Sequence, residues 1–196
     1  MEKAKILTIL FTIFLIGCFA STRPSKPRSD PDGFRGIKWG TEISKLQDME
    51  RMEQDKSSNP DLVWYTRKAD TLAIGEAKLE NIFYLFWMGN FASVSIDFKG
   101  KENFETLKKE LLEQFGSTVR SEEHTRKRDQ RVGIDPSKTG GADSFYAWWG
   151  KNTDILLSYS KDRHIGTLDI SSTSITEERR AYEKQKEQEE RLKKGF

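Results

Sequence analysis

Two stretches of the sequence, each long enough for a pair of strands, constrain the fold more than any other feature. The first, residues 81–98, opens with an aromatic run that is apolar on both sides, as in a covered central strand. It then alternates, so that Val94, Ile96 and Phe98 share one side. A period of two residues predicts a strand with one face in the core and one in water. Residues 154–171 form a second stretch of the same kind.

The second stretch repeats the first at a shift of 72 positions, which places Phe83 on Ile155 and Ile96 on Leu168 without a gap. An aromatic strand and, before it, an amphipathic helix precede each stretch. We therefore predict an α+β fold in which two α-β-β-β units, about 41–98 and 101–171, form one antiparallel sheet with helices on one face. Chance similarity between two amphipathic hairpins is the alternative.

Shorter patterns predict the remaining elements. Residues 34–39 alternate like one strand, and Thr41 is placed to cap a short helix. We also predict strands over residues 62–66 and 144–149 and a turn at Gly89–Asn90. Helix 101–115 has one apolar stripe and stops at Gly116. Residues 176–196 are almost entirely polar and predict a solvated helix, with Ser174 and Glu177 as a capping box.

The N-terminus has the three parts of an export signal. Lys3 and Lys5 precede the apolar residues 6–16, a run too short to cross a bilayer comfortably. Leu15-Ile16-Gly17-Cys18 follows, and Cys18 is the only cysteine of the chain. This segment resembles the lipobox of bacterial membrane lipoproteins. An uncleaved anchor or an ordinary secretory signal is the alternative.

The resemblance implies a specific modification. The Cys18 thiol would accept a diacylglyceryl group, and signal peptidase would cut between Gly17 and Cys18, leaving residues 1–17 behind. A further fatty acid on the freed amine would make attachment stable. The protein would then be anchored outside the cytoplasm. In a bacterium with two membranes, Phe19 after the cysteine, rather than Asp, implies the outer membrane, facing the periplasm or the surface.

Residues 18–33 carry three of the five prolines and predict an extended tether after the lipidated cysteine. The folded domain would span residues 34–175, and residues 176–196 would form its charged tail. The segment from Gly33 to Thr41, Gly-Phe-Arg-Gly-Ile-Lys-Trp-Gly-Thr, is similar to the opening of small exported bacterial proteins with no assigned function.

Composition and motifs favour no enzyme class. The net charge is +2, with 33 basic and 31 acidic residues, so no nucleic-acid partner is indicated. His124 and His164 lack a second ligand at metal spacing, and we predict no metal and no cofactor. Residues 133–141 contain the ingredients of a phosphate loop in the wrong order, which favours an ordinary surface loop.

Trp148 and Trp149 are the candidate binding residues, because neighbours on a strand point to opposite faces and cannot both be core if one face is wet. The outward one is either an exposed binding anchor or is buried under the tail or the long loop. We expect a non-enzymatic envelope module that binds a protein or another envelope component. One alternative is an envelope-acting hydrolase or sugar-binding enzyme that uses Asp97, Asp169 or His164. Another is an inhibitor or immunity protein, which rests on fold analogy alone.

Overall fold

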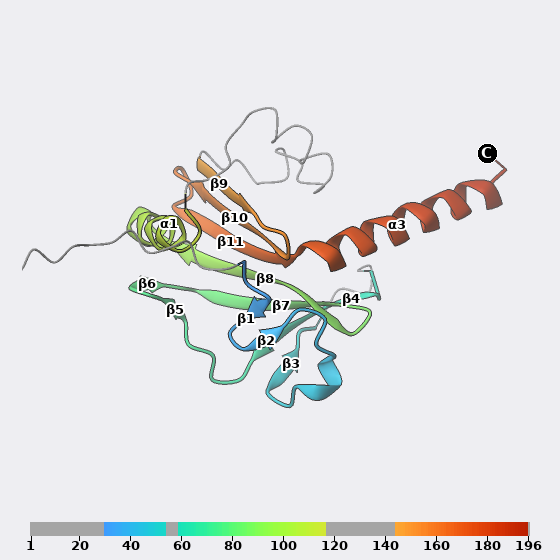
Figure 1. Ribbon diagram of the computed structural model, residues 1–196, viewed down its shortest axis with the longest axis horizontal. Coiled ribbons are helices and arrows are strands. Elements are labelled where there is room, and N and C mark those ends of the chain that lie inside the picture. The colour runs from blue at the N-terminus through green and yellow to red at the C-terminus, as the bar shows by residue number, and fades with distance from the viewer. Residues whose placement is uncertain (1–29, 54–58, 117–143, 196) are drawn as a thin grey trace, which may run out of the picture.

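The computed structural model describes residues 30–53, 59–116 and 144–195. The predicted lipidation site Cys18, its neighbour Gly17, His124 and the loop 133–141 lie outside these ranges. At the centre is an antiparallel sheet of seven strands in the order β3-β4-β7-β8-β11-β10-β9 (Figure 1). Together with the helices α1 (Lys101–Phe115) and α3 (Thr173–Lys193), this sheet confirms the predicted α+β class.

Six strands of this sheet follow the predicted ranges closely, and the seventh, Met49–Arg51, was not predicted. Their bounds are β3 (Met49–Arg51), β4 (Leu62–Arg67), β7 (Asn81–Trp87), β8 (Asn90–Lys99), β9 (Ser144–Trp149), β10 (Thr153–Ser160) and β11 (Ile165–Ser172). Strand β8 pairs with β11, so the two predicted strand pairs meet at the middle of the sheet. The turn between β7 and β8 is Met88–Gly89, one residue earlier than predicted, and both residues have positive φ.

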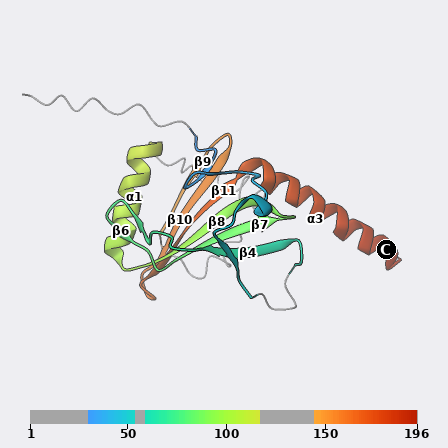
Figure 2. The ribbon, with the colours of Figure 1, turned by 90° about the horizontal axis from the view of Figure 1, so that it is seen from below.

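One face of the sheet, here called the core face, carries the hydrophobic core. Its fully buried side chains include Tyr84, Phe86, Val94, Ile96, Leu157 and Leu168. Helix α1 begins and ends at the predicted residues and buries Phe104, Leu107 and Leu111. It contacts β8 and β10, and also β6 (Ala77–Lys78), which pairs with β5 (Ala73–Ile74) in a small separate hairpin (Figure 2).

The beginning of the domain differs from the prediction. Residues 34–39 are not one strand: β1 (Gly33–Phe34) and β2 (Ile37–Lys38) form a hairpin. Arg35 and Gly36 make its turn with φ of 47° and 80°. The expected short helix is only the 3₁₀ turn η1 (Ile43–Lys45), and no side chain caps it. The Thr41 carbonyl instead accepts a hydrogen bond from the Phe91 backbone N–H, which holds this segment against the sheet.

The gap-free repeat is also wrong in one strand. At a shift of 72 positions Phe83 would match Ile155, but Ile155 lies on the core face and Phe83 on the opposite one. Strand pairing places Ile82 opposite Ile96 and Leu157 opposite Leu168, so β7 and β10 correspond at an odd shift of 75 when β8 and β11 correspond at 72. The cause is the connection: β7 and β8 join through two residues with a bulge, and β10 and β11 through four. A slip of one residue exchanges the two faces of a strand.

Helix α3 corrects the expectation of a solvated helical tail, because its first turns pack on the sheet. Strand β11 leads directly into α3, whose N-cap is Ser172 rather than Ser174, with the Ser172 hydroxyl accepting from the Ile175 N–H. Ile175 packs against Trp87 and Ala92 on the face opposite α1, here called the second face. After these first turns the helix runs away from the sheet (Figure 1). In this part of the helix, Glu187 and Arg191 form an ion pair at 2.7 Å.

Both ends of the domain meet at the turn between β9 and β10. The Asn152 backbone N–H donates to the Asp30 carboxylate, and its carbonyl accepts from the Thr173 N–H at 2.9 Å. The Thr153 hydroxyl donates to the Pro31 carbonyl at 2.5 Å and accepts from the Trp39 indole N–H at 2.7 Å. Residues 30–33, predicted to belong to the tether, are therefore packed against the domain.

Candidate functional site

The second face of the sheet has an unusual distribution of side chains. Its central strands β8 and β11 present a polar column, and the strands on either side present apolar and aromatic residues. Strand pairing places the column at Ser93, Ser95, Asp97, Thr167, Asp169 and Ser171, with Trp64, Phe83 and Leu85 on one side and Phe145, Trp149 and Leu156 on the other. Such a face offers hydrogen bonds flanked by apolar surface, which suits a binding site.

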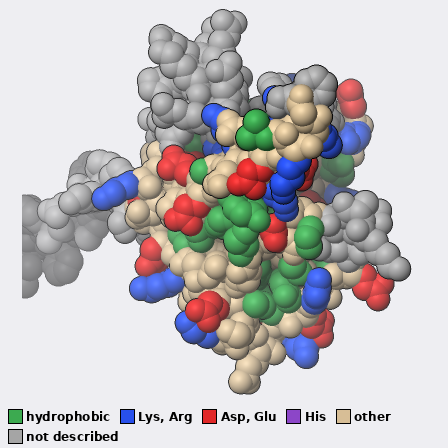
Figure 3. Space-filling view, turned by 90° about the vertical axis from the view of Figure 1, so that its right-hand side faces the viewer, with side chains coloured by type: hydrophobic (Ala, Val, Ile, Leu, Met, Phe, Trp, Pro, Cys, Tyr) green, Lys and Arg blue, Asp and Glu red, His purple; other side chains and the backbone are tan. Residues whose placement is uncertain are grey.

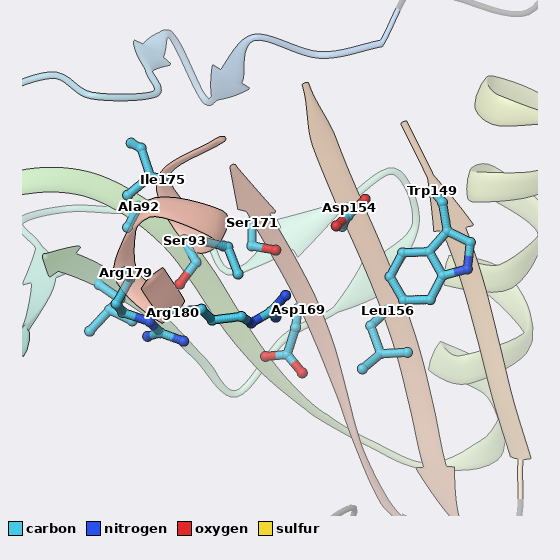
Figure 4. Close-up of a pocket in the computed structure, with 12 residues that line it drawn as sticks. Ala92, Ser93, Trp149, Asp154, Leu156, Asp169, Ser171, Ile175, Arg179 and Arg180 are labelled. Carbon is cyan, nitrogen blue, oxygen red and sulfur yellow. The ribbon is translucent and has the colours of Figure 1, made fainter. Parts of the chain in front are cut away.

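A groove of about 230 Å³ lies between this face and the first turns of α3. Figure 4 shows residues of both elements converging on it. We call it the α3 groove. It is lined by Leu85, Ala92, Ser93, Trp149, Asp154, Leu156, Asp169, Ser171, Ile175, Thr176, Arg179 and Arg180. The groove therefore combines an aromatic ring, an apolar floor, two carboxylates and two guanidinium groups.

The two adjacent tryptophans of β9 have different surroundings. Trp148 lies in the core, 5% exposed, and its indole N–H donates to the Gly116 carbonyl at 2.9 Å. Trp149 points to the second face and lines the α3 groove (Figure 4). The alternation expected of a strand therefore separates them, and only Trp149 is placed to touch a ligand.

The predicted carboxylates are partly brought together. Asp169 lines the α3 groove and accepts a hydrogen bond from Ser95 at 2.6 Å. Asp97 lies on the second face but does not line the groove. Asp154, which was not predicted as a site residue, does line the groove. His164 is exposed at the far end of the hairpin, in the turn after β10, with its Nδ1 3.4 Å from the Tyr159 hydroxyl. Of the two carboxylates that line the groove, the sequence therefore predicted only Asp169.

Asp169 is not the ordinary solvent-facing residue that its place on an alternating strand suggests. Burial raises the pKa of its carboxyl group; the hydrogen bond from Ser95 opposes this change, and the nearby charge of Asp97 adds to it. The folded protein therefore binds the Asp169 proton more tightly than the unfolded chain does, and ionised Asp169 destabilises the fold.

Asp169→Asn is expected to increase the free energy of unfolding at neutral pH, because the amide removes a buried charge and still accepts from Ser95. The gain should shrink as the pH falls through the raised pKa of Asp169 and vanish below the ordinary carboxyl pKa of 3.8, where the wild-type group is protonated in both states. Urea denaturation at pH 7 and pH 3 measures both values. The matched control is Asp162→Asn in an exposed turn. A gain equal at both pH values, or a loss at pH 7, would contradict this reading.

Arg179 and Arg180 were missed by sequence reasoning, which assigned residues 176–196 to a solvated tail. Both line the α3 groove. Desolvation lowers the pKa of Arg180, and the neighbouring positive charge of Arg179 lowers it further. In Figure 4 the Arg180 side chain extends from α3 over β11, above Asp169. The one available signal was spacing: Arg179 lies four residues after the apolar Ile175, hence on the same side of a helix.

A second polar cluster lies on the core side and is fully paired within itself. Asp70 binds the Arg35 guanidinium and accepts from the Tyr84 hydroxyl at 2.6 Å. Nearby, Arg67 donates to Asp48 at 2.6 Å. Burial and the hydrogen bond to Asp70 raise the pKa of Tyr84. This cluster connects the β1–β2 hairpin to the sheet, so we assign it a structural role.

Other kinds of site receive no support in the described part of the chain. Among its residues, no group of three or more His, Cys, Asp or Glu side chains could hold a metal ion. Over the same ranges, the helices are too short or too polar to cross a membrane. The side seen in Figure 3 carries charged side chains of both signs interspersed with hydrophobic ones. Comparison with known protein families, curated proteins and solved structures finds no match.

Proposed function

We propose that this protein is a membrane-anchored lipoprotein of the bacterial envelope, held through lipid on Cys18, whose domain binds a protein or another envelope component through the α3 groove. One observation carries the binding part: Trp149, Arg179 and Arg180 line the same groove. Tryptophan and arginine are the residue types that contribute most often to binding energy at interfaces. The anchoring part rests on the lipobox resemblance.

The fold is compatible with this arrangement. Asp30, the first described residue, binds Asn152 at the β9–β10 turn, and Trp149 and Asp154 of the groove pair with each other directly beside this turn. Eleven residues separate Cys18 from Asp30. An extended segment of that length reaches about 35 Å. A lipid on Cys18 would therefore keep the groove within a few tens of ångströms of the membrane surface.

Trp149→Ala is expected to lower the recovery of the bound partner by about tenfold or more, the effect of losing one interface anchor residue. The full-length protein would be purified from its native membranes after mild cross-linking, and the bound material quantified. Trp64→Ala is the matched control, because Trp64 is a half-buried tryptophan on the same face but outside the groove. Equal recovery from both variants would contradict binding through the groove.

Acid–base chemistry on an envelope polysaccharide is the second candidate function. The observation in its favour is that two carboxylates, Asp154 and Asp169, line one groove, and that the pKa of Asp169 is raised, as a general acid requires. This candidate predicts release of reducing sugar ends from purified cell-wall polysaccharide. Asp169→Asn should abolish that release if the candidate holds, whereas a wild-type protein without activity excludes it.

We also infer that the sheet arose from one repeated three-strand unit. What supports this is the sheet order, in which β4-β7-β8 and β9-β10-β11 extend outward from the β8–β11 pair. With β8 and β11 aligned at a shift of 72, strand pairing aligns the core residues of β7 and β10 at a shift of 75. Among the described residues of the first unit, the counterpart of α1 is only the 3₁₀ turn η1.

A further inference from the structure

We propose that the α3 groove binds a carboxylate carried on an apolar group, as presented by an acidic peptide segment of a partner protein. This inference rests on the proposed function and specifies the chemistry of its ligand. Three features carry it: the hydrogen-bond donors of the groove, its apolar walls and its size.

The groove holds hydrogen-bond donors that lack acceptors. The Nε of Arg179 is buried and has no hydrogen-bond partner, and its nearest carboxylate oxygen, on Glu183, lies at 3.8 Å. The Arg180 side chain is partly buried and forms no hydrogen bond with a described residue, while the charges of Asp154, Glu177 and Glu183 attract its guanidinium group. A donor that is withdrawn from water and left unpaired, as the Arg179 Nε is, destabilises the empty groove. A ligand that supplies acceptor oxygens would recover this energy.

The walls of the groove indicate what carries those oxygens. Trp149, Leu156 and Leu85 form apolar surface on the sheet side, and Ile175 closes the end beneath α3. The volume of about 230 Å³ is below the range of about 300–1,000 Å³ typical of sites for whole small molecules. The groove therefore suits one group of a larger partner, namely an apolar side chain with a neighbouring carboxylate.

The charges of the groove favour a carboxylate over a phosphate. Asp154 and Asp169 line the same groove and repel anions, a dianionic phosphate more strongly than a single carboxylate. Two guanidinium groups on one helix match the planar, two-oxygen geometry of a carboxylate. A neutral sugar could accept hydrogen bonds from the guanidinium groups, but it would form no charge-assisted hydrogen bond with them.

The test compares two probes of equal size on the full chain kept in solution with detergent. N-acetyl-phenylalanine carries a carboxylate beside an aromatic ring, and N-acetyl-phenylalanine amide differs only in lacking the charge. Isothermal titration calorimetry should give an affinity about tenfold or more higher for the carboxylate, as expected for a charge-assisted hydrogen bond. Inorganic phosphate and phosphatidylglycerol vesicles are the further probes, and both are expected to bind more weakly than the carboxylate.

Three variants assign the effect to Arg180. Arg180→Gln should reduce the affinity for the carboxylate probe by about tenfold, and Arg180→Lys should retain part of it, because lysine keeps the charge but not the planar donors. Lys184→Gln makes the same charge change at an exposed position of the same helix and should leave the affinity within about twofold.

Equal binding of the two wild-type probes, no binding of the carboxylate, or an equal loss in Lys184→Gln would overturn the inference, and so would stronger binding of phosphate or vesicles. The first comparison needs no variant, so a folding defect cannot obscure it. If these tests fail while Trp149→Ala still loses the partner, the ligand class is wrong and the groove remains the binding site. If the probes bind as expected but Trp149→Ala recovers as much partner as the wild type, the proposed function is wrong.

Discussion

Cys18→Ser is expected to abolish incorporation of a palmitate analogue and to release the protein from the membrane fraction. Serine is nearly the same size as cysteine but lacks the thiol that accepts the diacylglyceryl group, and the chain has no second cysteine to replace it. Because lipid attachment would supply the membrane affinity of the mature chain, the expected change is close to complete. Metabolic labelling followed by membrane fractionation measures both effects.

Ser21→Ala is the control for this experiment, because it changes a hydroxyl-bearing residue three positions after Cys18 and should leave labelling and fractionation unchanged. Intact mass spectrometry of the wild-type protein adds an independent reading. A mature chain that begins at Cys18 and carries acyl groups agrees with the proposed anchor. A chain that still carries Met1, or labelling that persists in Cys18→Ser, would refute it.

Trp148→Ala is expected to lower the free energy of unfolding by about 3–5 kcal/mol, the usual cost of removing a large aromatic side chain from a core. The side chain is 5% exposed and lies in the same core cluster as Ile155 and Leu111, and its indole N–H donates to the Gly116 carbonyl at the end of α1. The alanine variant therefore leaves a cavity and also removes the hydrogen bond to the Gly116 carbonyl. The midpoint of urea denaturation gives the change.

Two further variants separate these contributions. Trp148→Phe keeps most of the volume and loses the hydrogen bond, so we expect a loss of about 1–2 kcal/mol, plus a smaller packing cost. Trp149→Ala removes a partly exposed side chain and should cost less than Trp148→Ala, although the residues are adjacent. A larger loss from Trp149→Ala would mean that the faces of β9 are assigned the wrong way round.

Much of the fold could be predicted because its signals are local. The alternation in residues 90–99 depends only on which side chains face the core, and β8 spans Asn90–Lys99. Helix α1 begins and ends at the predicted residues because its apolar stripe and Gly116 mark it within one segment. In the same way, the period of two implies that Trp148 and Trp149 face opposite sides.

The rest depends on contacts between distant segments, which local patterns do not contain. The repeat appeared gap-free because β7 is apolar on both faces, so that Phe83 and Tyr84 fitted equally well. Only pairing with β8 shows which of them faces the core. Likewise, the polar sequence of α3 predicts a solvated helix, and most of it is exposed. Its first turns instead lie over the sheet because Ile175 docks on Trp87 and Ala92.

The most direct test of where a partner binds is photo-cross-linking in cells that produce the protein. A photo-cross-linking amino acid replaces one residue at a time. We predict that a cross-linker in place of Trp149 yields a discrete adduct. The same group in place of Trp64, on the same face but outside the groove, should yield little or none. An adduct from position 64 without one from position 149, or equal adducts from both, would contradict binding in the α3 groove.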